Sequence, residues 1–436
     1  MRKFLSYVLL LTLLLSVFAG CSGKSETPAT AEPTTDSAAP AGEEGPVKLQ
    51  IWMTPQGNAE TYMNDKISKF NEEYAGKIFV DYSVIPRGGD FGYENKITAS
   101  VASKTMPDIF RIDGPNVANY AYTGIIQPIG SYFTNEELSD FVPSILAQGT
   151  YEDQLYALGE TESSVALFYN KKMLDAAGVT PPQTLDEAWT WDEFYQAVKA
   201  CTKDGVYGLN LGLHMGVGEW MTYMGAPFIW SNGGDIISAD GKTAEGYINS
   251  TESVEALQLI QKLASEKLIN LTPTPTEFLD EGAAMTLIGT WQVAYMENNP
   301  DIEWGITYFP YSKSKVSPSG DWCWGVSSQC KYPEEAATFL KYLLSAEGVT
   351  EYAGLLGKLP ARTSSYETLD YNAFPLNVLK TQSTETAHAR PAVSTYPVVT
   401  QEFAKAFDDI MKGADAQERL DKAAVVIDEE IERNYP

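Results

Sequence analysis

Polar side chains follow two predicted strands in the first quarter of the chain, at the points where those strands end. They are Gln56, Asp113 and Asn116. In sheets built from strand–helix–strand units, ligands bind at the edge formed by the carboxyl ends of the strands. Carboxylate and amide groups at such an edge can exchange hydrogen bonds with a polar ligand. We therefore predict that these side chains face a ligand, with a turn or helix-capping role as the alternative for Asp113.

Five aromatic side chains are further candidates for a binding cleft. They are Tyr223, Trp230, Trp291, Trp322 and Trp324. An aromatic ring offers a flat apolar face to a ligand, and Tyr and Trp add a hydrogen-bonding group. Aromatic residues make up 12% of the chain, which supplies more rings than one small cleft needs. Packing in the core is therefore the alternative for each of the five.

Three charged side chains complete the candidate set. Glu162 precedes a predicted strand, Arg362 lies in the run LPAR, and Arg390 lies near the C-terminal helices. Each can hydrogen-bond a polar ligand. A surface ion pair, which contributes little to stability, is the alternative for the two arginines.

The elements that must position these side chains alternate between strand and helix at the start of the folded part. Strand-like runs cover 47–53, 77–85 and 106–113, and helical patterns cover 59–75 and 93–105. This order predicts parallel strands joined by right-handed crossovers, and hence an α/β fold.

Local signals place two later helices. Asn170 is a predicted N-cap, and Gly178 is the predicted stop of the short helix that follows. Thr190 and Glu193 form a predicted capping box, which opens a helix that runs to Cys201.

Familiar catalytic motifs are absent from the sequence. It contains no GxSxG, HExxH or Walker pattern. The run GVGEWM has the first two glycines of a dinucleotide-binding loop, but Met221 stands where that motif has its last glycine. The 58 acidic residues leave room for a carboxylate pair of the glycoside-hydrolase kind, but nothing singles one out. We predict that the protein is not an enzyme.

The composition argues against several kinds of partner. A formal net charge of −27 disfavours nucleic acid and anionic lipid headgroups. Two His and four Cys are too few for a metal cluster or a disulfide framework, although Cys323 and Cys330 could pair. We expect no cofactor and no metal.

The first 46 residues predict export and membrane anchoring. Two basic residues precede an uncharged, largely apolar run over 4–19, which is shorter than the roughly 20 residues of a membrane-spanning helix. The end of this run resembles a bacterial lipobox, with an ordinary signal peptide as the alternative. We predict a signal peptide over 1–20, a lipid-modified Cys21, and a disordered tether over 21–46 that contains no Ile, Leu, Phe, Tyr or Trp.

Several stretches of the folded part, taken in order, resemble the extracellular solute-binding proteins of bacterial ABC importers, in the branch of maltose-binding protein. The stretches are ASKTMPDIFRID, GIIQPI, YALGETESSVALFYNKKMLDAAGV, PFIWSNGGDI, MTLIGTWQVAYM, PSGDWCWGVSSQCKYPEEAATFLKYLLSAEG and KLPAR. Each stretch is weak alone, and their order along the chain makes the resemblance specific.

The resemblance implies a two-lobe fold, like that of periplasmic binding proteins. Each lobe would be a mainly parallel sheet flanked by helices, with three crossovers forming a hinge. The N-terminal lobe would take 47–161 plus 306–347, and the C-terminal lobe 162–305 plus 348–436.

The resemblance also bears on single residues. Trp291 and Tyr223 match cleft positions of the family, while Glu162 lies one residue from its cleft glutamate, at whose position Ser163 stands. The family often has proline where Gly159 or Glu160 stands, and this departure puts the local match in doubt.

The function implied is capture of a solute between closing lobes and its delivery to a membrane permease. The large number of aromatic residues and the resemblance to the branch of maltose-binding protein favour a carbohydrate ligand, in particular an oligosaccharide. A polyol, a sugar phosphate or a peptide is an alternative ligand. A surface-anchored enzyme acting on glycans and a lipoprotein that only recruits a partner protein are alternative functions. We expect a monomer outside the cytoplasm, anchored to the cell membrane through Cys21.

Overall fold

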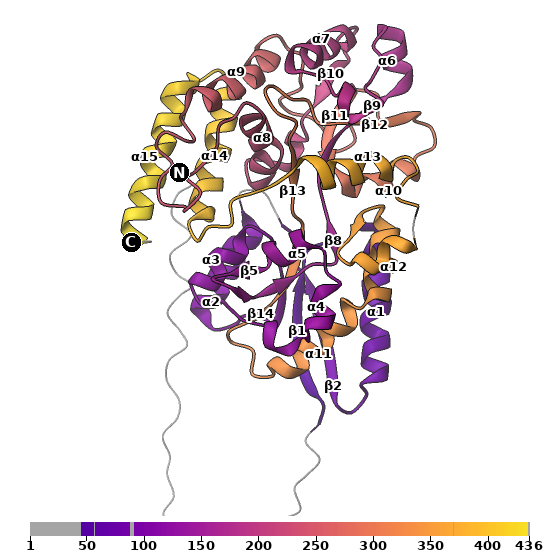
Figure 1. The fold of residues 1–436 in the computed structure, drawn as a ribbon, viewed down its shortest axis with the longest axis vertical. Helices are drawn as coiled ribbons and strands as arrows, with labels where there is room; N and C mark the ends of the chain where they lie inside the picture. The colour runs from indigo at the N-terminus through magenta and orange to yellow at the C-terminus, as the bar shows by residue number, and fades with distance from the viewer. Residues whose placement is uncertain (1–44, 56, 88–90, 369, 435–436) are drawn as a thin grey trace, which may run out of the picture. The chain divides into compact units, whose positions relative to one another are not determined.

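The computed structural model describes residues 45–434 apart from 56, 88–90 and 369. The predicted signal peptide, Cys21, nearly all of the tether and Gln56 lie outside the described residues, so the predictions for them stay predictions. Two main sheets with surrounding helices organise the described chain (Figure 1). No helix within this part combines the length and apolar character that crossing a membrane requires.

The first sheet holds the predicted strand–helix–strand units. In spatial order its strands are β2 (Ile78–Val84), β1 (Val47–Met53), β3 (Ile109–Asp113), β14 (Trp322–Ser327) and β4 (Ile126–Gln127), and β7 (Ala157–Leu158) pairs with β14. β1 runs parallel to β2 and to β3, which confirms the predicted unit. Asp113 is the last residue of β3, at the carboxyl edge where the sequence predicts it.

The helices that pack around the first sheet are α1 (Glu60–Glu73), α2 (Gly92–Ser103), α3 (Asn116–Tyr122), α4 (Asn135–Ser139), α5 (Pro143–Gln148), α11 (Pro333–Leu343) and α12 (Ala346–Leu356). A small ladder of β5 (Thr150–Tyr151) and β6 (Gln154–Leu155) lies in the same part of the chain. Apolar residues at helical spacing bury one face of α1. Phe70 on that face packs edge-on against Phe339 of α11, with ring centroids 5.0 Å apart.

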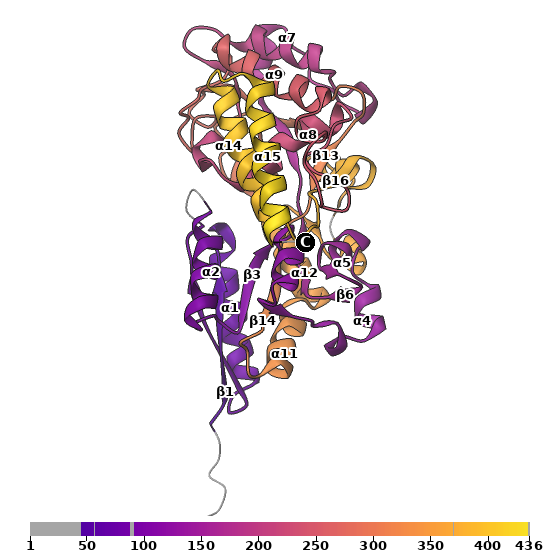
Figure 2. The same ribbon diagram turned by 90° about the vertical axis from the view of Figure 1, so that its left-hand side faces the viewer.

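The second sheet has the strand order β10 (Tyr207–Asn210), β11 (Ala283–Gly289), β9 (Val165–Asn170) and β12 (Trp304–Thr307). Its core is shared by α6 (Lys171–Ala177), α7 (Trp191–Cys201), α8 (Glu219–Ser231), α9 (Thr251–Ser265), α10 (Val293–Glu297), α13 (Leu376–Thr381), α14 (Tyr396–Met411) and α15 (Ala416–Asn434). Figure 2 shows α14 and α15 side by side.

The predicted caps are confirmed. The Asn170 side chain accepts a hydrogen bond from the Met173 N–H at the start of α6, and Gly178 with a φ of 70° ends that helix. Thr190 and Glu193 make both bonds of the capping box that opens α7. These signals lie within a few residues of one another, so the sequence alone specifies them.

One detail of the predicted sheets is wrong, because both sheets are mixed rather than mainly parallel. β14 runs antiparallel to β3, β4 and β7, and β9 runs antiparallel to β11 and β12. Parallel neighbours need a long crossover connection, usually a helix. β14 instead enters the first sheet directly from the second lobe, so its direction is not constrained by such a connection.

α8 differs from the other helices because every one of its residues is buried. A helix that is apolar all round belongs in the interior, and the segment 220–231 contains no charged residue. The one charge of α8 is its first residue, Glu219. α8 thus places Glu219, Tyr223 and Trp230 inside the protein.

The chain passes between the two lobes three times. Two short ladders form at these passages, one of β8 (Thr161–Glu162) with β15 (Leu359–Pro360) and one of β13 (Ser317–Ser319) with β16 (Ala387–Ala389).

The predicted limits of the lobes stay a prediction. Val349, Tyr352 and Leu356 of α12 pack in the hydrophobic cluster of the first sheet, although the sequence reading gives 348–436 to the second lobe.

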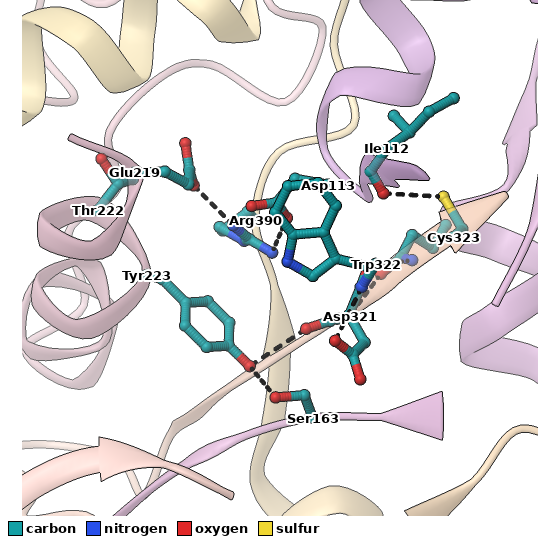
Figure 3. Close-up of polar contacts among 12 residues, drawn as sticks. Ile112, Asp113, Ser163, Glu219, Thr222, Tyr223, Asp321, Trp322, Cys323 and Arg390 are labelled. Atoms are coloured by element: carbon teal, nitrogen blue, oxygen red, sulfur yellow. Dashed lines mark hydrogen bonds and ion pairs between the residues drawn. The ribbon is translucent and has the colours of Figure 1, made fainter. Parts of the chain in front are cut away.

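The three described cysteines are buried and free, so the pairing considered for Cys323 and Cys330 does not form. The Cys323 thiol instead donates to the Ile112 carbonyl oxygen at 3.4 Å (Figure 3). Burial raises the pKa of the Cys201 thiol to about 11.

Candidate functional site

Four charged side chains from distant parts of the chain meet in what we call the central cluster: Arg87, Asp113, Glu219 and Arg390. Arg390 Nη2 lies 2.9 Å from Asp113 Oδ1, and its Nη1 lies 2.6 Å from Glu219 Oε1 (Figure 3). Arg87 Nη2 lies 2.7 Å from the second oxygen of Asp113. The side chains of Asp113, Glu219 and Arg390 are only 4–5% exposed, so water screens their interactions little.

The members of the central cluster come from four separate parts of the chain. Arg87 follows β2, Asp113 ends β3, Glu219 begins α8, and Arg390 directly follows β16. The N-terminus of a helix favours a negative charge, because its free N–H groups point outward. Tyr396 and Thr400 of α14 also donate hydrogen bonds to the Glu219 carboxylate, with Thr400 Oγ1 2.6 Å from Oε2.

The two carboxyl groups of the central cluster have opposite pKa shifts. Burial alone would raise the pKa of Asp113, but the guanidinium groups of Arg390 and Arg87 hold it below its usual range. Burial raises the pKa of Glu219, and Arg390 offsets only part of that effect. Asp113 is therefore an ionised hydrogen-bond acceptor at neutral pH.

Beside the central cluster stand three rings, Trp220, Tyr223 and Trp291, which we call the aromatic wall. Tyr223 and Trp291 are nearly parallel, with ring centroids 6.5 Å apart and an interplanar angle of 21°. Trp220 meets Trp291 edge-on at 5.8 Å. The Arg390 guanidinium lies 4.4 Å from the Tyr223 ring centroid, which joins the wall to the central cluster.

The wall also contacts the crossover segments. The Tyr223 hydroxyl lies 3.2 Å from the Gly320 carbonyl oxygen and 3.3 Å from Ser163 Oγ (Figure 3). Glu162 accepts hydrogen bonds from the Gly320 N–H at 2.6 Å and from the Ser163 N–H at 3.0 Å. Lys358 Nζ lies 6.0 Å from the Trp291 ring centroid. Residues of both lobes and of the crossovers therefore meet here.

Replacing Glu162 with glutamine is expected to raise the free energy of unfolding at pH 7. Burial raises the pKa of Glu162, so keeping its carboxylate ionised costs the folded protein free energy above that pKa. The gain should disappear as the pH falls below about 4.3, the unfolded value, because wild-type Glu162 is then protonated in both states. Urea unfolding at pH 7 and pH 4 measures the difference.

Glu193→Gln is the matched control for that experiment, and its effect should have the opposite sign. Hydrogen bonds from Thr190 hold the pKa of Glu193 below its usual range, so the charge stabilises the fold above the unfolded pKa. Loss of stability in Glu162→Gln at pH 7 would contradict the prediction.

Of the predicted site residues, the structure brings Asp113, Tyr223, Trp291 and Glu162 together around the crossovers. Trp322 borders this group, because the Arg87 guanidinium lies 4.9 Å from its ring centroid. A ligand-binding role for these residues stays a prediction.

The other predicted residues have different surroundings. Trp324 is fully buried and donates its indole N–H to Glu160 at 2.6 Å. Trp230 donates its indole N–H to Asp235 Oδ1 at 3.1 Å, and its ring lies against the His388 ring with centroids 4.3 Å apart and an interplanar angle of 31°.

Two more candidates lie outside the contacts of the central cluster. Asn116 is buried at the first position of α3. Arg362 is buried and donates to Asp140 Oδ2 at 3.1 Å and to the Leu344 carbonyl oxygen at 2.6 Å. For Trp324, Trp230 and Arg362 these contacts favour a packing role, and ligand binding stays a prediction.

Sequence reasoning missed Glu219 and underrated Arg390. Glu219 lies in GVGEWM, which drew attention only as an incomplete nucleotide-binding loop. The available signal was an isolated charge at the start of a long uncharged apolar segment. Arg390 was given a surface ion pair as its alternative, whereas it is 6% exposed.

Comparisons with known proteins agree with this architecture. Residues 66–377 match the family model of bacterial extracellular solute-binding proteins. The chain is 24% identical over 376 residues to an arabinooligosaccharide-binding protein of Bacillus subtilis, covering 82% of this chain and 79% of the relative. It is 23% identical over 391 residues to the diacetylchitobiose-binding protein DasA of Streptomyces coelicolor, covering 85% of each.

A solved structure shows the same fold. An ABC substrate-binding protein of Listeria monocytogenes, in complex with cycloalternan, superposes with a TM-score of 0.77 at 21% identity. The match covers 89% of this chain and 99% of that one.

Proposed function

The chain belongs to the bacterial extracellular solute-binding proteins, and from this premise we propose that it captures a carbohydrate between its two lobes for an ABC importer. The observation that carries the proposal is the aromatic wall beside the buried, ion-paired central cluster. Two relatives also support the proposal, because their names record binding of arabinooligosaccharide and of diacetylchitobiose.

The pairing of rings and charges suits a sugar. A pyranose has apolar C–H faces, which the rings of Tyr223 and Trp291 can cover, and hydroxyl edges that need hydrogen-bonding partners. Arg390 and Asp113 supply a donor and an acceptor that are already held in place. A site with buried polar groups rejects a ligand that leaves them unpaired, which gives specificity.

Binding without turnover fits the state of the two carboxylates. Glu219 accepts from Arg390, Tyr396 and Thr400, so both of its oxygens are already engaged. Asp113 is held ionised by two arginines, so it carries no proton for a leaving group.

The cellular setting is part of the proposal. A lipid on Cys21 would hold the binder at the outer face of the membrane, and the tether would let the closed lobes reach a permease. We expect a monomer, because a single pair of lobes encloses the ligand.

The first experiment is a thermal-shift screen of residues 45–436 against mono- and oligosaccharides, polyols and peptides, with product analysis. A ligand at 100 times its dissociation constant adds about 2.7 kcal/mol to the stability of the fold. A shift caused by sugars that are recovered intact supports the proposal. Hydrolysed sugar would establish an enzyme instead, and a shift with peptides alone would overturn the carbohydrate assignment.

Trp291→Ala is expected to weaken binding of the sugar found in that screen by about 10- to 100-fold, because the wall loses apolar contact area and ring stacking. Isothermal titration calorimetry measures the change. Trp189→Ala is the matched control, since Trp189 is a partly buried tryptophan that lines a surface concavity beside α7, and no residue of the wall lines that concavity. Equal affinity of Trp291→Ala and wild type would remove the wall from the site.

A further inference from the structure

A single buried carboxylate, that of Asp321, joins the three passages of the chain between the lobes. Thr161 lies on β8 in the first passage, Asp321 lies between β13 and β14 in the second, and Lys358 directly precedes β15 in the third. Lys358 Nζ and Thr161 Oγ1 each lie 2.6 Å from Asp321 Oδ2. We call these three residues the hinge triad.

The hinge triad is shielded from water. The side chains of Asp321 and Lys358 are 4% and 8% exposed, and Thr161 is buried as well. The second carboxylate oxygen, Asp321 Oδ1, accepts from the Trp322 N–H at 2.9 Å (Figure 3). Separating the two buried charges would leave each without compensation, which is strongly unfavourable. The ion pair should therefore stay closed while the lobes move.

The backbone of Asp321 is fixed to the first lobe. Gln148 of α5 donates its side-chain N–H to the Asp321 carbonyl oxygen at 2.8 Å and accepts from the Asp321 N–H at 3.0 Å. Gly114, which follows β3, donates to the same carbonyl oxygen at 3.2 Å. The second passage is therefore anchored at Asp321, and a change in its direction has to occur before that residue.

The residue before Asp321 is a glycine, which gives the second passage freedom to bend. Gly320 has a φ of 104°, a conformation that residues with a Cβ rarely adopt. Its carbonyl oxygen accepts from the Tyr223 hydroxyl of the aromatic wall, and its N–H donates to Glu162. A few residues at the ends of elements absorb the changes in φ and ψ when domains close. We therefore place the bend of the second passage at Gly320, between the wall and the anchored Asp321.

The side chain of Lys358 suits a joint of this kind. An ammonium group is a compact charge with three donors on a flexible four-carbon stem, so it can turn about a carboxylate without losing the ion pair. Lys358 Nζ also lies 6.0 Å from the Trp291 ring centroid, at the outer limit of the distance at which a cation is attracted to an indole face. Lys358 thus links the hinge triad with the aromatic wall.

We propose that Lys358 and Asp321 are positioning residues that restrict the angle between the lobes. Their ion pair holds the second and third passages together, the Thr161 hydroxyl adds the first, and Gly320 provides the bend. With the pair intact, the lobes of the ligand-free protein sample a narrow range of angles. The control of lobe movement stands by itself, whereas its effect on ligand capture rests on the proposed function.

The test measures the distance between the lobes after the ion pair is neutralised. Spin labels are attached to Glu334→Cys on α11 and Gln258→Cys on α9, two exposed positions, in residues 45–436. The described native cysteines are buried, so the labels react at the introduced ones. Lys358→Met combined with Asp321→Asn removes both charges. Double electron–electron resonance of the ligand-free protein should then give a distance distribution about twofold wider than that of wild type. A merely structural role would lower the melting temperature and leave this width unchanged.

Lys66→Met combined with Glu351→Gln is the matched control. In this pair Lys66 Nζ lies 3.0 Å from Glu351 Oε2, and it joins α1 to α12 beside the first sheet, with Lys66 buried like Lys358. Its neutralisation should leave the width of the distribution unchanged. Thr161→Val removes one hydrogen bond of the hinge triad and keeps both charges, so it should widen the distribution less than the double variant does. Thr161→Val carries the test if the double variant does not fold.

An unchanged width in the hinge variants, or an equal widening in the control, would overturn the proposal. The sugar that binds wild type should bind the double variant about three- to tenfold more weakly, because fewer molecules hold the binding-competent angle. A wider distribution with unchanged affinity would overturn the effect on ligand capture. A wild type that binds no carbohydrate would overturn the proposed function alone, since the distances are measured without ligand.

Discussion

Arg390→Met is expected to lower the free energy of unfolding by about 3–5 kcal/mol at pH 7, the usual result of removing one partner from a buried ion pair. The variant leaves Glu219 without its cation in a site where the carboxylate is 4% exposed. The Asp113 carboxylate keeps part of its charge compensation, because Arg87 Nη2 remains 2.7 Å from its second oxygen. Most of the loss should therefore come from Glu219. Urea unfolding of the ligand-free protein measures it.

A second substitution identifies the source of that loss. Arg390→Met combined with Glu219→Gln should be more stable than Arg390→Met alone, because the glutamine removes the buried charge while its carbonyl oxygen can still accept from Tyr396 or from Thr400. The deficit of the single variant should also shrink as the pH falls, since protonation of Glu219 relieves its unpaired charge. A deficit that is below about 1 kcal/mol at pH 7 would show that Arg390 is not needed to compensate these carboxylates.

What the sequence predicted well was set by residues close together in the chain. The cap of Asn170 and the capping box of Thr190 depend on contacts three residues apart, and the helical pattern of α1 depends on a face visible in the sequence. Strand β3 ends at Asp113, where the apolar run ends. Such signals need no knowledge of the tertiary fold.

The central cluster was harder to predict because its partners are far apart in the chain. Arg390 and Asp113 are separated by 277 positions, and Arg390 and Glu219 by 171. An arginine in a polar run normally lies at the surface, and nothing beside Arg390 in the sequence indicates two buried carboxylates. The predicted parallel arrangement was wrong for β14 for a similar reason. The direction of β14 depends on how the chain passes between the lobes, and no local sequence signal shows this.

The departure from the family pattern at Gly159 and Glu160 has a structural reason. A Cβ on Gly159 would lie 2.9 Å from the Trp322 carbonyl oxygen, so a larger residue requires the backbone to shift. Glu160 is 1% exposed, accepts from the Trp324 indole N–H at 2.6 Å, and lies 3.5 Å from Arg111 Nη2. A proline at position 160 would leave the buried Arg111 without this carboxylate.

Glu160→Ala should therefore cost about 3–5 kcal/mol in the free energy of unfolding, measured in urea at pH 7. The substitution leaves Arg111 buried with 3% exposure and without its anion, although its Nη1 still lies 3.1 Å from the Tyr352 hydroxyl. The Trp324 N–H also loses its acceptor, which for a buried donor costs about 1–3 kcal/mol of that total. Glu160→Gln should cost less than alanine, because its carbonyl oxygen can still accept from Trp324.

The double variant Arg111→Met with Glu160→Gln separates loss of charge balance from loss of packing. If the unpaired charge dominates, the double variant is more stable than the sum of the two single losses implies, because no uncompensated charge remains. Losses that simply add would mean that Arg111 and Glu160 act independently. A favourable interaction energy between the two substitutions would show that the Arg111–Glu160 ion pair stabilises the crossover beside the candidate site. The proline that the family usually has at this position could not form that ion pair.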